Sequence, residues 1–286
     1  MKNIKLNNGL EIPAIGLGTW QSTSDEVMTA VSHALTHGYT HIDTAAIYGN
    51  EKEVGEGIRK SGVDRKDIFL TTKLWNNIST YDAAVEAFEA SLERLGTDYL
   101  DLYLIHWPGS YKRIQTVWKA MEDLYEQGKI KAIGVSNFEP HHLSALMETA
   151  KVKPVVNQVE CHVKVQCHFL QDICAKHDIY LQAYAPMMSW KVKELVADET
   201  LLGIAKKYGK TPSQVALRWL FERDIIVLPK SVTPSRIEEN INILDFSLDA
   251  EDMAAIRLLN DGVKLFPHPD NIDLGFNDDY AGEPID

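Results

Sequence analysis

The regular alternation of two kinds of segment constrains the fold more than any other feature of this sequence. Eight short apolar segments rich in β-branched residues are predicted strands: Ile15–Gly18, Tyr39–Asp43, Ile68–Lys73, Leu100–His106, Ile130–Ser136, Val155–Glu160, Tyr180–Tyr184 and Ile225–Pro229. Amphipathic segments between them are predicted helices: Asp25–Thr36, Glu51–Ser61, Tyr81–Leu95, Ile114–Gln127, Pro140–Ala150, Phe169–His177 and Pro212–Glu222. Such alternation is typical of βαβ units and a parallel sheet. Eight strands in one unbroken series favour an α/β fold of the closed (β/α)₈ barrel type over a doubly wound sheet.

The ends of the chain add to this barrel. Residues 1–13 are predicted to form a β-hairpin over Ile4–Ile12, with Asn7-Asn8-Gly9 at its turn. No linker-like segment interrupts the interior, and barrels of this kind commonly reach ~250 residues as one unit. We therefore expect one domain over residues 1–286. The acidic C-terminal tail, residues 262–286, has no clear period, and it either wraps the barrel or forms a loop that lines a pocket.

Composition excludes several classes of protein. The chain is 45% hydrophobic and 24% charged, as in soluble globular proteins, and its formal net charge is −12. This acidic balance opposes general binding to nucleic acids or anionic membranes. The first residues lack the apolar core of a signal peptide, no apolar run approaches the ~18 residues of a membrane span, and three cysteines fit a reducing compartment. We expect a cytoplasmic monomer.

Polar or aromatic residues occur where the predicted strands end. These residues are Asp43, Lys73, His106, Ser136, Asn137, Gln158, Tyr184 and Lys230. In a (β/α)₈ barrel the carboxyl ends of the strands meet on one face, and active sites form there. The pattern therefore predicts a functional site on that face.

Four of these or neighbouring residues form an acid–base set. A buried Lys73 close to Tyr48 favours the phenolate and is expected to lower the phenol pKa from about 10, which makes it a better proton donor. Asp43 would keep Lys73 charged and oriented, and His106 could hydrogen-bond a carbonyl oxygen. The structural alternative is a buried Asp–Lys ion pair beside a core tyrosine and histidine.

The last strand leads into a basic segment. Lys230, Ser231 and Arg236 lie around the N-terminus of a helix that begins after Thr233-Pro234. Backbone N–H groups and the helix dipole favour anions there, and a guanidinium matches a phosphomonoester. Neither a Gly-x-Gly-x-x-Gly segment after a strand nor a Walker-type loop is present, which disfavours a Rossmann domain and a P-loop.

Three segments together resemble the aldo-keto reductase family. They are Gly38–Ala45 with Tyr48–Glu51, then Gly134–Phe138 followed by Asn157-Gln158, and finally Lys230-Ser231 with Arg236 and Glu239-Asn240. The resemblance runs nearly end to end, in the family's order and spacing. Within the family, bacterial members similar to 2,5-diketo-gluconate and glyoxal reductases look closest.

The resemblance implies NADPH-dependent reduction of aldehydes or ketones to alcohols on a (β/α)₈ barrel. It implies a catalytic tetrad of Asp43, Tyr48, Lys73 and His106, with Tyr48 as the general acid. It further implies that NADPH/NADP⁺ is held by Ser136, Asn137, Gln158, Tyr184, Lys230, Ser231, Val232, Arg236, Glu239 and Asn240. Ser136, Asn137 and Gln158 would bind the nicotinamide carboxamide, Tyr184 would stack on the ring, and the remaining residues would hold the adenosine phosphate and adenine.

Tryptophans and one loop concern the substrate and the cofactor. Trp20, Trp75 and Trp107 each follow a predicted strand end, and aromatic walls around a polar floor suit a small carbonyl substrate. The structural alternative is packing at the barrel rim. Ala185–Trp190 replaces a Ser-Pro-Leu-Gly-type loop of many relatives, which affects the usual clamp on the cofactor pyrophosphate.

Other functions fit these residues less well. The group of Cys161, His162, Cys167, His168, Cys174 and His177 fits no common zinc spacing, and no metal is assigned. A nicotinamide-binding regulatory or structural protein has no need of Tyr48 or His106. A Schiff-base lyase would use Lys73 or Lys230 as its nucleophile. Both rank behind the reductase.

Overall fold

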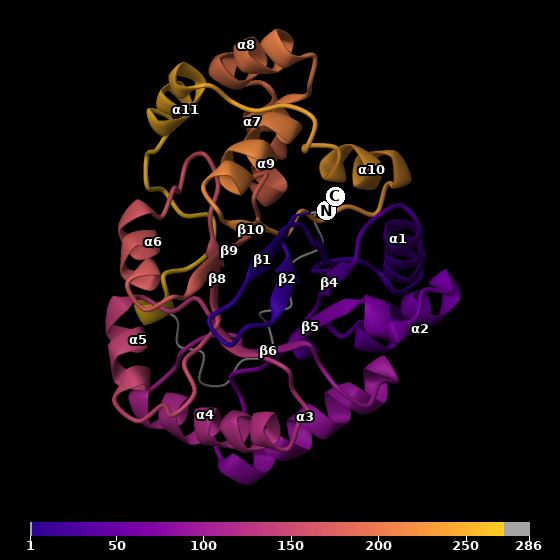
Figure 1. The fold of residues 1–286 in the computed structure, drawn as a ribbon, viewed down its shortest axis with the longest axis vertical. Helices are drawn as coiled ribbons and strands as arrows, with labels where there is room; N and C mark the ends of the chain where they lie inside the picture. Colours follow the sequence, from indigo (N-terminus) through magenta and orange to yellow (C-terminus); the bar gives the residue numbers. More distant parts are fainter. Residues whose placement is uncertain (1, 272–286) are drawn as a thin grey trace.

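The computed structural model describes residues 2–271, and its centre is a closed barrel of parallel strands (Figure 1). The eight strands are β3 (Leu17–Gly18), β4 (His41–Asp43), β5 (Phe69–Leu74), β6 (Leu102–Ile105), β7 (Ile133–Ser136), β8 (Val156–Glu160), β9 (Tyr180–Tyr184) and β10 (Ile226–Val227). Each pairs in parallel with the next along the chain. The first and last strands also meet, because Gly16 N–H donates to Val227 O at 2.9 Å and Gly18 N–H to Pro229 O at 3.0 Å. The predicted (β/α)₈ barrel is confirmed.

The strands mostly fall within their predicted ranges and are shorter at their ends. Only β9 has its predicted bounds. At β10 the ladder covers two residues of the predicted Ile225–Pro229, although Ile225 and Leu228 are buried beside it. The apolar segments therefore predict which residues are buried. At the ends of the barrel, burial continues beyond the residues that are paired in the sheet.

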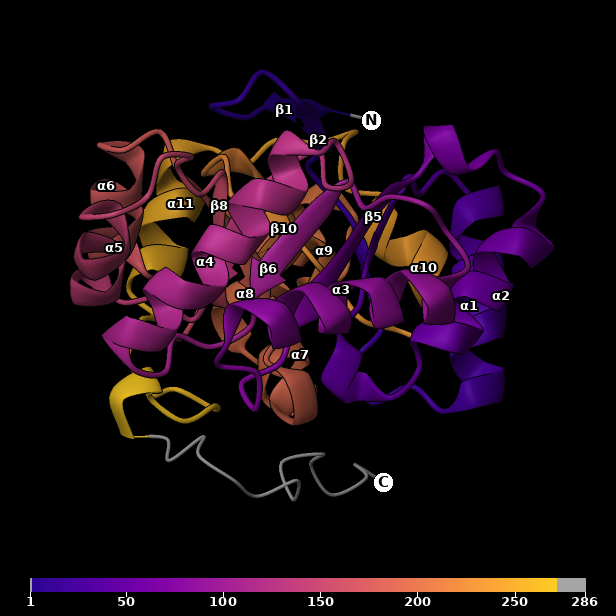
Figure 2. The ribbon, with the colours of Figure 1, turned by 90° about the horizontal axis from the view of Figure 1, so that it is seen from below.

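Helices surround the barrel (Figures 1 and 2). Those at predicted places are α1 (Ser24–Thr36), α2 (Glu51–Ser61), α3 (Tyr81–Leu95), α4 (Tyr111–Glu126), α5 (Pro140–Met147), α6 (His168–Ala175), α9 (Pro212–Glu222) and α10 (Pro234–Ile241). The prediction missed α7 (Val192–Val196), α8 (Glu199–Tyr208) and α11 (Ala250–Arg257). For α8 the sequence carried a signal, because the Asp198 carboxylate caps the helix by accepting from the N–H groups of Thr200 and Leu201.

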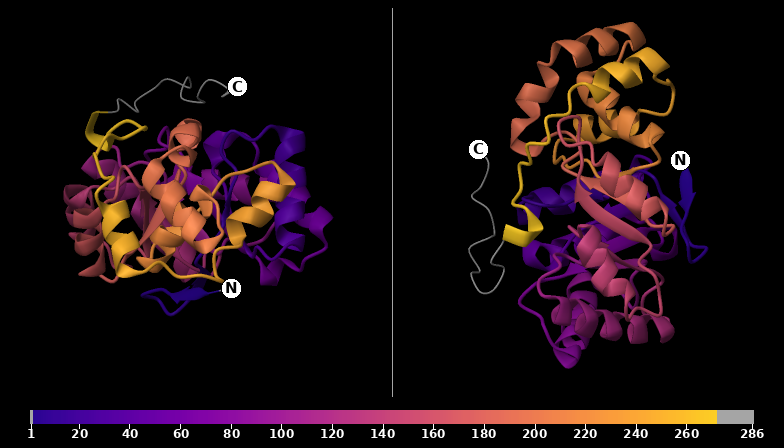
Figure 3. Two further views of the ribbon diagram at one scale, coloured as in Figure 1. Left: turned by 90° about the horizontal axis from the view of Figure 1, so that it is seen from above. Right: turned by 90° about the vertical axis from the view of Figure 1, so that its left-hand side faces the viewer.

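The N-terminal hairpin closes one end of the barrel. Its strands β1 (Asn3–Lys5) and β2 (Glu11–Pro13) are antiparallel with Ile4 opposite Ile12, as predicted. The Asn7 side-chain amide donates to Pro154 O at 2.9 Å and to Asp178 O at 3.1 Å, just before β8 and β9 begin. Figures 2 and 3 show the hairpin on the side opposite the last described residues, up to residue 271. The carboxyl ends of the strands, away from the hairpin, are therefore left for a functional site.

The C-terminal tail is described only in part. The predicted tail, residues 262–286, is described only to residue 271, and the remainder of that prediction lies outside the described residues. The single-domain organisation stays a prediction. Among residues 2–271, no helix combines the length and apolar character that crossing a membrane requires.

The packing of α2 against the end of α3 gives a test of the helical layer. A methyl group added at Gly55 would lie 2.2 Å from the backbone oxygen of Leu95, so Gly55→Ala must push two helices apart. We expect a loss of roughly 1–3 kcal/mol in the free energy of unfolding. Urea unfolding followed by circular dichroism measures it.

Gly203→Ala is the matched control. Gly203 lies exposed in α8 with nothing within 4 Å of an added methyl group, so the same substitution should stabilise by about 0.5–1 kcal/mol through helix propensity. Equal effects at both positions would contradict the close approach of α2 and α3.

Candidate active site

A cavity of about 650 Å³ lies at the carboxyl ends of the strands. Asp43 ends β4, Lys73 lies in β5, His106 follows β6, and Tyr48 ends the short 3-10 helix η1 (Ala46–Tyr48). The cavity is lined by Trp20, Gln21, Ile47, Tyr48, Trp75, His106, Trp107, Asn137, Gln158, Tyr184, Trp190, Lys264, Leu265, Phe266 and Pro267. The predicted face of the barrel is thus hollowed, and aromatic side chains dominate its wall.

A buried ion pair lies beside the cavity floor. The Lys73 ammonium donates to Asp43 Oδ1 at 2.5 Å, to Thr44 O at 2.8 Å and to the Tyr48 hydroxyl oxygen at 3.4 Å. The other Asp43 oxygen accepts from the Gln158 amide at 2.8 Å. Asp43 and Lys73 are both buried. Each of the three ammonium protons has an acceptor, and one of these acceptors is Tyr48, which lines the cavity.

The pKa of the Tyr48 phenol differs from the sequence-based expectation. Burial raises it above its ordinary value, and the nearby Lys73 charge, which lowers it, does not fully compensate. Burial alone would lower the pKa of Lys73, but the Asp43 carboxylate and then Tyr48 raise it overall. The expectation that Lys73 brings the phenol below about 10 is therefore wrong for this structure, because desolvation of a phenolate outweighs the Coulombic effect.

His106 is held as a neutral imidazole. Burial, and then the positive charges of Lys73 and Arg113, keep its pKa well below the ordinary value. Its ring packs edge-on against Tyr48 and Trp75, with centroids 5.7 Å and 5.2 Å away. A neutral imidazole carries one N–H and can donate a hydrogen bond to an oxygen in the cavity.

Residues predicted to bind nicotinamide lie together at the ends of β7, β8 and β9. The Tyr184 hydroxyl donates to Asn137 Oδ1 at 2.9 Å, the Asn137 amide donates to His106 O at 3.0 Å, and the Ser136 hydroxyl donates to Gln158 O at 2.8 Å. Asn137, Gln158 and Tyr184 line the cavity, whereas Ser136 is buried and does not. The geometry places amide and phenol groups beside His106.

The predicted phosphate-binding residues form a second cluster after β10. Lys230 and Arg236 are exposed at the N-terminal end of α10, and the Lys230 ammonium donates to Gln21 O at 3.3 Å. Partial desolvation lowers the pKa of Lys230, and the nearby Glu26 carboxylate opposes this effect. The Ser231 hydroxyl oxygen accepts from Thr233 N–H at 3.1 Å. Of the remaining members, Val232 is half-buried, Asn240 is buried, and the Glu239 carboxylate accepts from the Thr211 hydroxyl.

The three predicted tryptophans Trp20, Trp75 and Trp107 all line the cavity. Two aromatic residues were missed there, Trp190 and Phe266, whose ring centroids lie 5.1 Å apart. Phe266 also packs 5.4 Å from Trp20 and 5.1 Å from Tyr184. Phe266 lies in a segment without periodicity, so the sequence pattern did not assign it to the cavity. One of the two predictions for the tail, a loop that lines a pocket, does agree with its position.

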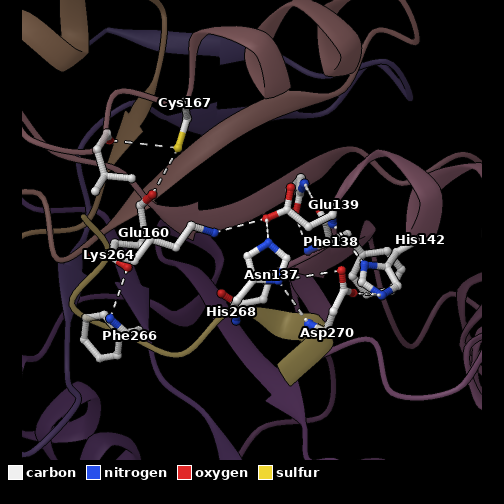
Figure 4. A network of polar contacts seen from close by, with 12 residues as sticks. Asn137, Phe138, Glu139, His142, Glu160, Cys167, Lys264, Phe266, His268 and Asp270 are labelled. Carbon is white, nitrogen blue, oxygen red and sulfur yellow. Dashed lines mark hydrogen bonds and ion pairs between the residues drawn. The ribbon is translucent and has the colours of Figure 1, made fainter. Parts of the chain in front are cut away.

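Hydrogen bonds fix the segment that carries Phe266 (Figure 4). The buried Glu160 carboxylate accepts from Leu265 N–H at 2.7 Å and from Phe266 N–H at 3.2 Å. One residue earlier, the Lys264 ammonium donates to the Glu139 carboxylate at 3.1 Å. These contacts hold residues 264–267 over the cavity as part of its wall.

Arg113 is a buried residue that the sequence analysis did not identify. Its guanidinium donates to Ile78 O at 2.7 Å, Trp107 O at 3.0 Å, Pro108 O at 3.1 Å and Trp75 O at 3.0 Å. Burial lowers its pKa to about 10. Arg113 thereby ties together the two loops that present Trp75 and Trp107.

The Ala185–Trp190 loop adopts an unusual backbone. Ala185, Met188 and Ser189 have φ values of +48°, +65° and +46°. Residues other than glycine rarely adopt this left-handed backbone region, so the surroundings of the loop must hold it in place. Met188 is buried in the core and Trp190 reaches the cavity wall, which accounts for two anchors of the loop.

Comparisons with known proteins agree with this geometry. Residues 14–261 match the model of the "Aldo/keto reductase family". The chain is 47% identical over 270 residues to the glyoxal reductase of Bacillus subtilis, covering 94% of this chain and 96% of that protein. It superposes with a TM-score of 0.93 on an aldo-keto reductase from a Medee basin deep-sea metagenome library, at 55% identity over 94% and 99% of the two chains. A Bombyx mori aldo-keto reductase in complex with NADP gives 0.89, at 36% identity over 94% and 96%.

Replacing Arg113 tests how the two tryptophan loops are held. In Arg113→Lys a single ammonium cannot reach all four carbonyl oxygens, so buried acceptors are left without donors. We expect the free energy of unfolding to fall by about 1–3 kcal/mol and the tryptophan fluorescence of the folded protein to change.

Arg257→Lys is the control, because Arg257 is exposed in α11. Urea unfolding and emission spectra of both variants give the comparison. An Arg113→Lys variant as stable as Arg257→Lys would show that the guanidinium does not carry the loops.

Proposed function

Because the chain belongs to the aldo/keto reductase family, we propose that it reduces aldehydes and ketones to alcohols with NADPH at the cavity described above. The observation that carries the proposal is the Lys73 ammonium donating to the Tyr48 hydroxyl oxygen at 3.4 Å, beside a neutral His106 on the same cavity. The NADP-bound Bombyx mori relative supports the choice of cofactor.

The donor groups of this chain suit a phosphorylated nicotinamide cofactor. Ser136, Asn137 and Gln158 offer hydroxyl and amide groups for the carboxamide, and Tyr184 offers an aromatic face for the ring. At the other end Lys230, Ser231, Val232 and Arg236 would hold the 2′-phosphate, with Glu239 and Asn240 near the adenine. The exposed cations at the start of α10 support this assignment, because a helix N-terminus with a guanidinium suits a phosphate.

In the proposed reaction the bound cofactor supplies a hydride to the carbonyl carbon. Tyr48 donates its phenolic proton to the carbonyl oxygen, and Lys73 stabilises the phenolate that remains. Asp43 keeps Lys73 charged and fixed in place. His106 donates a hydrogen bond that orients the carbonyl oxygen toward Tyr48. Groups on or beside the cavity floor thereby account for the proton and the charge, and the hydride would come from the bound cofactor.

The cavity wall supports small carbonyl compounds as substrates. Aromatic side chains surround a polar floor that includes Tyr48 and His106, which suits an aldehyde or a dicarbonyl; they are Trp20, Trp75, Trp107, Trp190 and Phe266. The name of the Bacillus subtilis relative, a glyoxal reductase, points to the same class.

The three cysteines are unpaired, which supports a reducing compartment such as the cytoplasm.

A carbonyl panel tests the function itself. NADPH or NADH is incubated with the protein and aldehydes, dicarbonyls, keto acids, keto esters or sugars, and the loss of reduced-nicotinamide absorbance is followed. We expect oxidation of NADPH with aldehydes or dicarbonyls. Nicotinamide binding without oxidation by any member of the panel would favour the regulatory or structural alternative.

Tyr48→Phe tests the proton donor. Loss of the hydroxyl should reduce kcat by about 10²–10⁴-fold, because general acid catalysis disappears while the ring still packs on His106. NADPH binding, measured by its fluorescence, should persist. Tyr111→Phe is the matched control, since Tyr111 is 52% exposed in α4. Turnover by Tyr48→Phe at the rate of the control would refute the assigned role.

Arg236→Ala tests the phosphate site. A hydrogen bond to a charged group contributes about 1.5–3 kcal/mol, so KM for NADPH should rise roughly 10–100-fold while KM for NADH changes little. Arg257→Ala, another exposed arginine on a helix, controls for a general loss of positive charge. An equal rise for both cofactors would place Arg236 away from the 2′-phosphate.

A further inference from the structure

Two histidines and a glutamate meet on the surface where α1 and α10 lie side by side (Figure 1). His33 lies in the last turn of α1, and His37 follows one turn later as its C-terminal cap. The Glu238 carboxylate on α10 has one oxygen 2.8 Å from His33 Nε2 and 3.9 Å from His37 Nε2. The three ligand atoms all lie within 4.8 Å of one another. None of these residues lines the active-site cavity.

The hydrogen bonds of His37 leave its outer nitrogen available. His37 Nδ1 lies 2.8 Å from the backbone oxygen of His33, which can only accept. The proton of the neutral ring is therefore on Nδ1, and Nε2 carries the lone pair. Metal-binding histidines are usually oriented in this way, with the second ring N–H bonded to a carbonyl oxygen.

The Glu238 oxygen lies near the distance from each histidine nitrogen that a shared ion requires, and the ligand atoms of the two histidines lie within 4.8 Å of each other. Tetrahedral Zn²⁺ with ligand bonds of about 2.0–2.1 Å places its ligand atoms about 3.3 Å apart. The observed 2.8 Å and 3.9 Å lie about half an ångström on either side of that value. The side chains of His37 and Glu238 are 43% and 51% exposed. The His33 and His37 rings are stacked with their centroids 3.8 Å apart, so binding requires the His37 ring to turn about its Nδ1 hydrogen bond until both Nε2 atoms face the ion.

The other histidine cluster has the opposite arrangement. His142 Nδ1 accepts from the backbone N–H of Glu139 at 3.1 Å, so the proton of the neutral ring is on Nε2, which faces Asp270 at 3.2 Å. Asp270 also lies 2.9 Å from His141 Nε2. His142 has no second lone pair for a metal while it caps α5. This cluster is a hydrogen-bonded attachment of the C-terminal segment (Figure 4).

We propose that His33, His37 and Glu238 form a binding site for a divalent transition-metal ion of the Zn²⁺, Ni²⁺ or Cu²⁺ class, with water completing the coordination. Imidazole ligands suit these ions, and two histidines one helical turn apart present two of them on one face. A bound ion replaces the proton through which His33 contacts Glu238.

The ion would join α1 to α10, the helix that carries Arg236, Glu239 and Asn240. At present α10 is tied to this side of the barrel by the Tyr39 hydroxyl, which donates to Ile237 O at 3.0 Å, and by His33. Binding an ion to the folded state alone stabilises that state. Metal binding and the rise in stability require no cofactor, so they are tested independently of the proposed reductase activity.

Calorimetric titration with Zn²⁺, and the visible absorption of bound Co²⁺, test the site. The sample for this titration is prepared without a polyhistidine tag and without cofactor. We expect one ion per chain, a tetrahedral Co²⁺ spectrum and a raised midpoint of thermal unfolding. His33→Gln, His37→Gln and Glu238→Gln should each weaken binding by at least about tenfold. Circular dichroism confirms that these surface variants fold.

His177→Gln is the matched control, because His177 is an exposed histidine outside both clusters. It should bind Zn²⁺ like the wild type. Absence of binding by the wild type would overturn the proposal. So would unchanged binding by the double variant His33→Gln/His37→Gln, which would assign the ion to other side chains, with His141 and His142 the first to replace.

Discussion

The ion pair between Lys73 and Asp43 is the interaction on which the site depends. Removing two charges from water costs several kcal/mol per ion unless hydrogen bonds replace the lost hydration. Here Thr44, Tyr48 and Gln158 supply those bonds, from the residue after β4, from η1 and from β8. Gln158 is 115 residues from Asp43 in sequence, so the pair is fully satisfied only when the sheet has curled into a barrel. The complete set of hydrogen bonds on this ion pair therefore exists only in the closed barrel.

The charge that this pair maintains acts in two directions. The Lys73 ammonium opposes the rise in the Tyr48 pKa that burial causes, and it adds to the fall in the His106 pKa that burial begins. The pKa of Tyr48 is thereby kept lower than burial alone would leave it, and His106 is kept neutral. Two side chains with ring centroids 5.7 Å apart thus take different protonation roles from one fixed cation. The fold supplies this difference by burying Lys73 and His106 and half-burying Tyr48 beside them.

The sequence predicted the barrel and the face on which the cavity lies, because both follow from residue order along the strands. Asp43, Lys73, His106 and Tyr184 were found at strand ends without any knowledge of contacts. Arg113 was missed because its partners are backbone carbonyl oxygens, which leave no mark in a sequence. The direction of the Tyr48 pKa was wrong because it depends on how desolvation compares with a charge, and the depth of burial decides that. Phe266 was not placed because its position depends on backbone hydrogen bonds to Glu160.

The same contacts argue against Schiff-base chemistry in this barrel. A lysine attacks a carbonyl carbon only as a neutral amine with a free lone pair. Lys73 donates all three of its protons, to Asp43, Thr44 and Tyr48, and the Asp43 carboxylate raises its pKa against the effect of burial. Burial lowers the pKa of Lys230, but that residue does not line the cavity. In the proposed reaction the buried lysine would therefore act as a fixed charge on a neighbouring tyrosine, an arrangement that suits proton transfer.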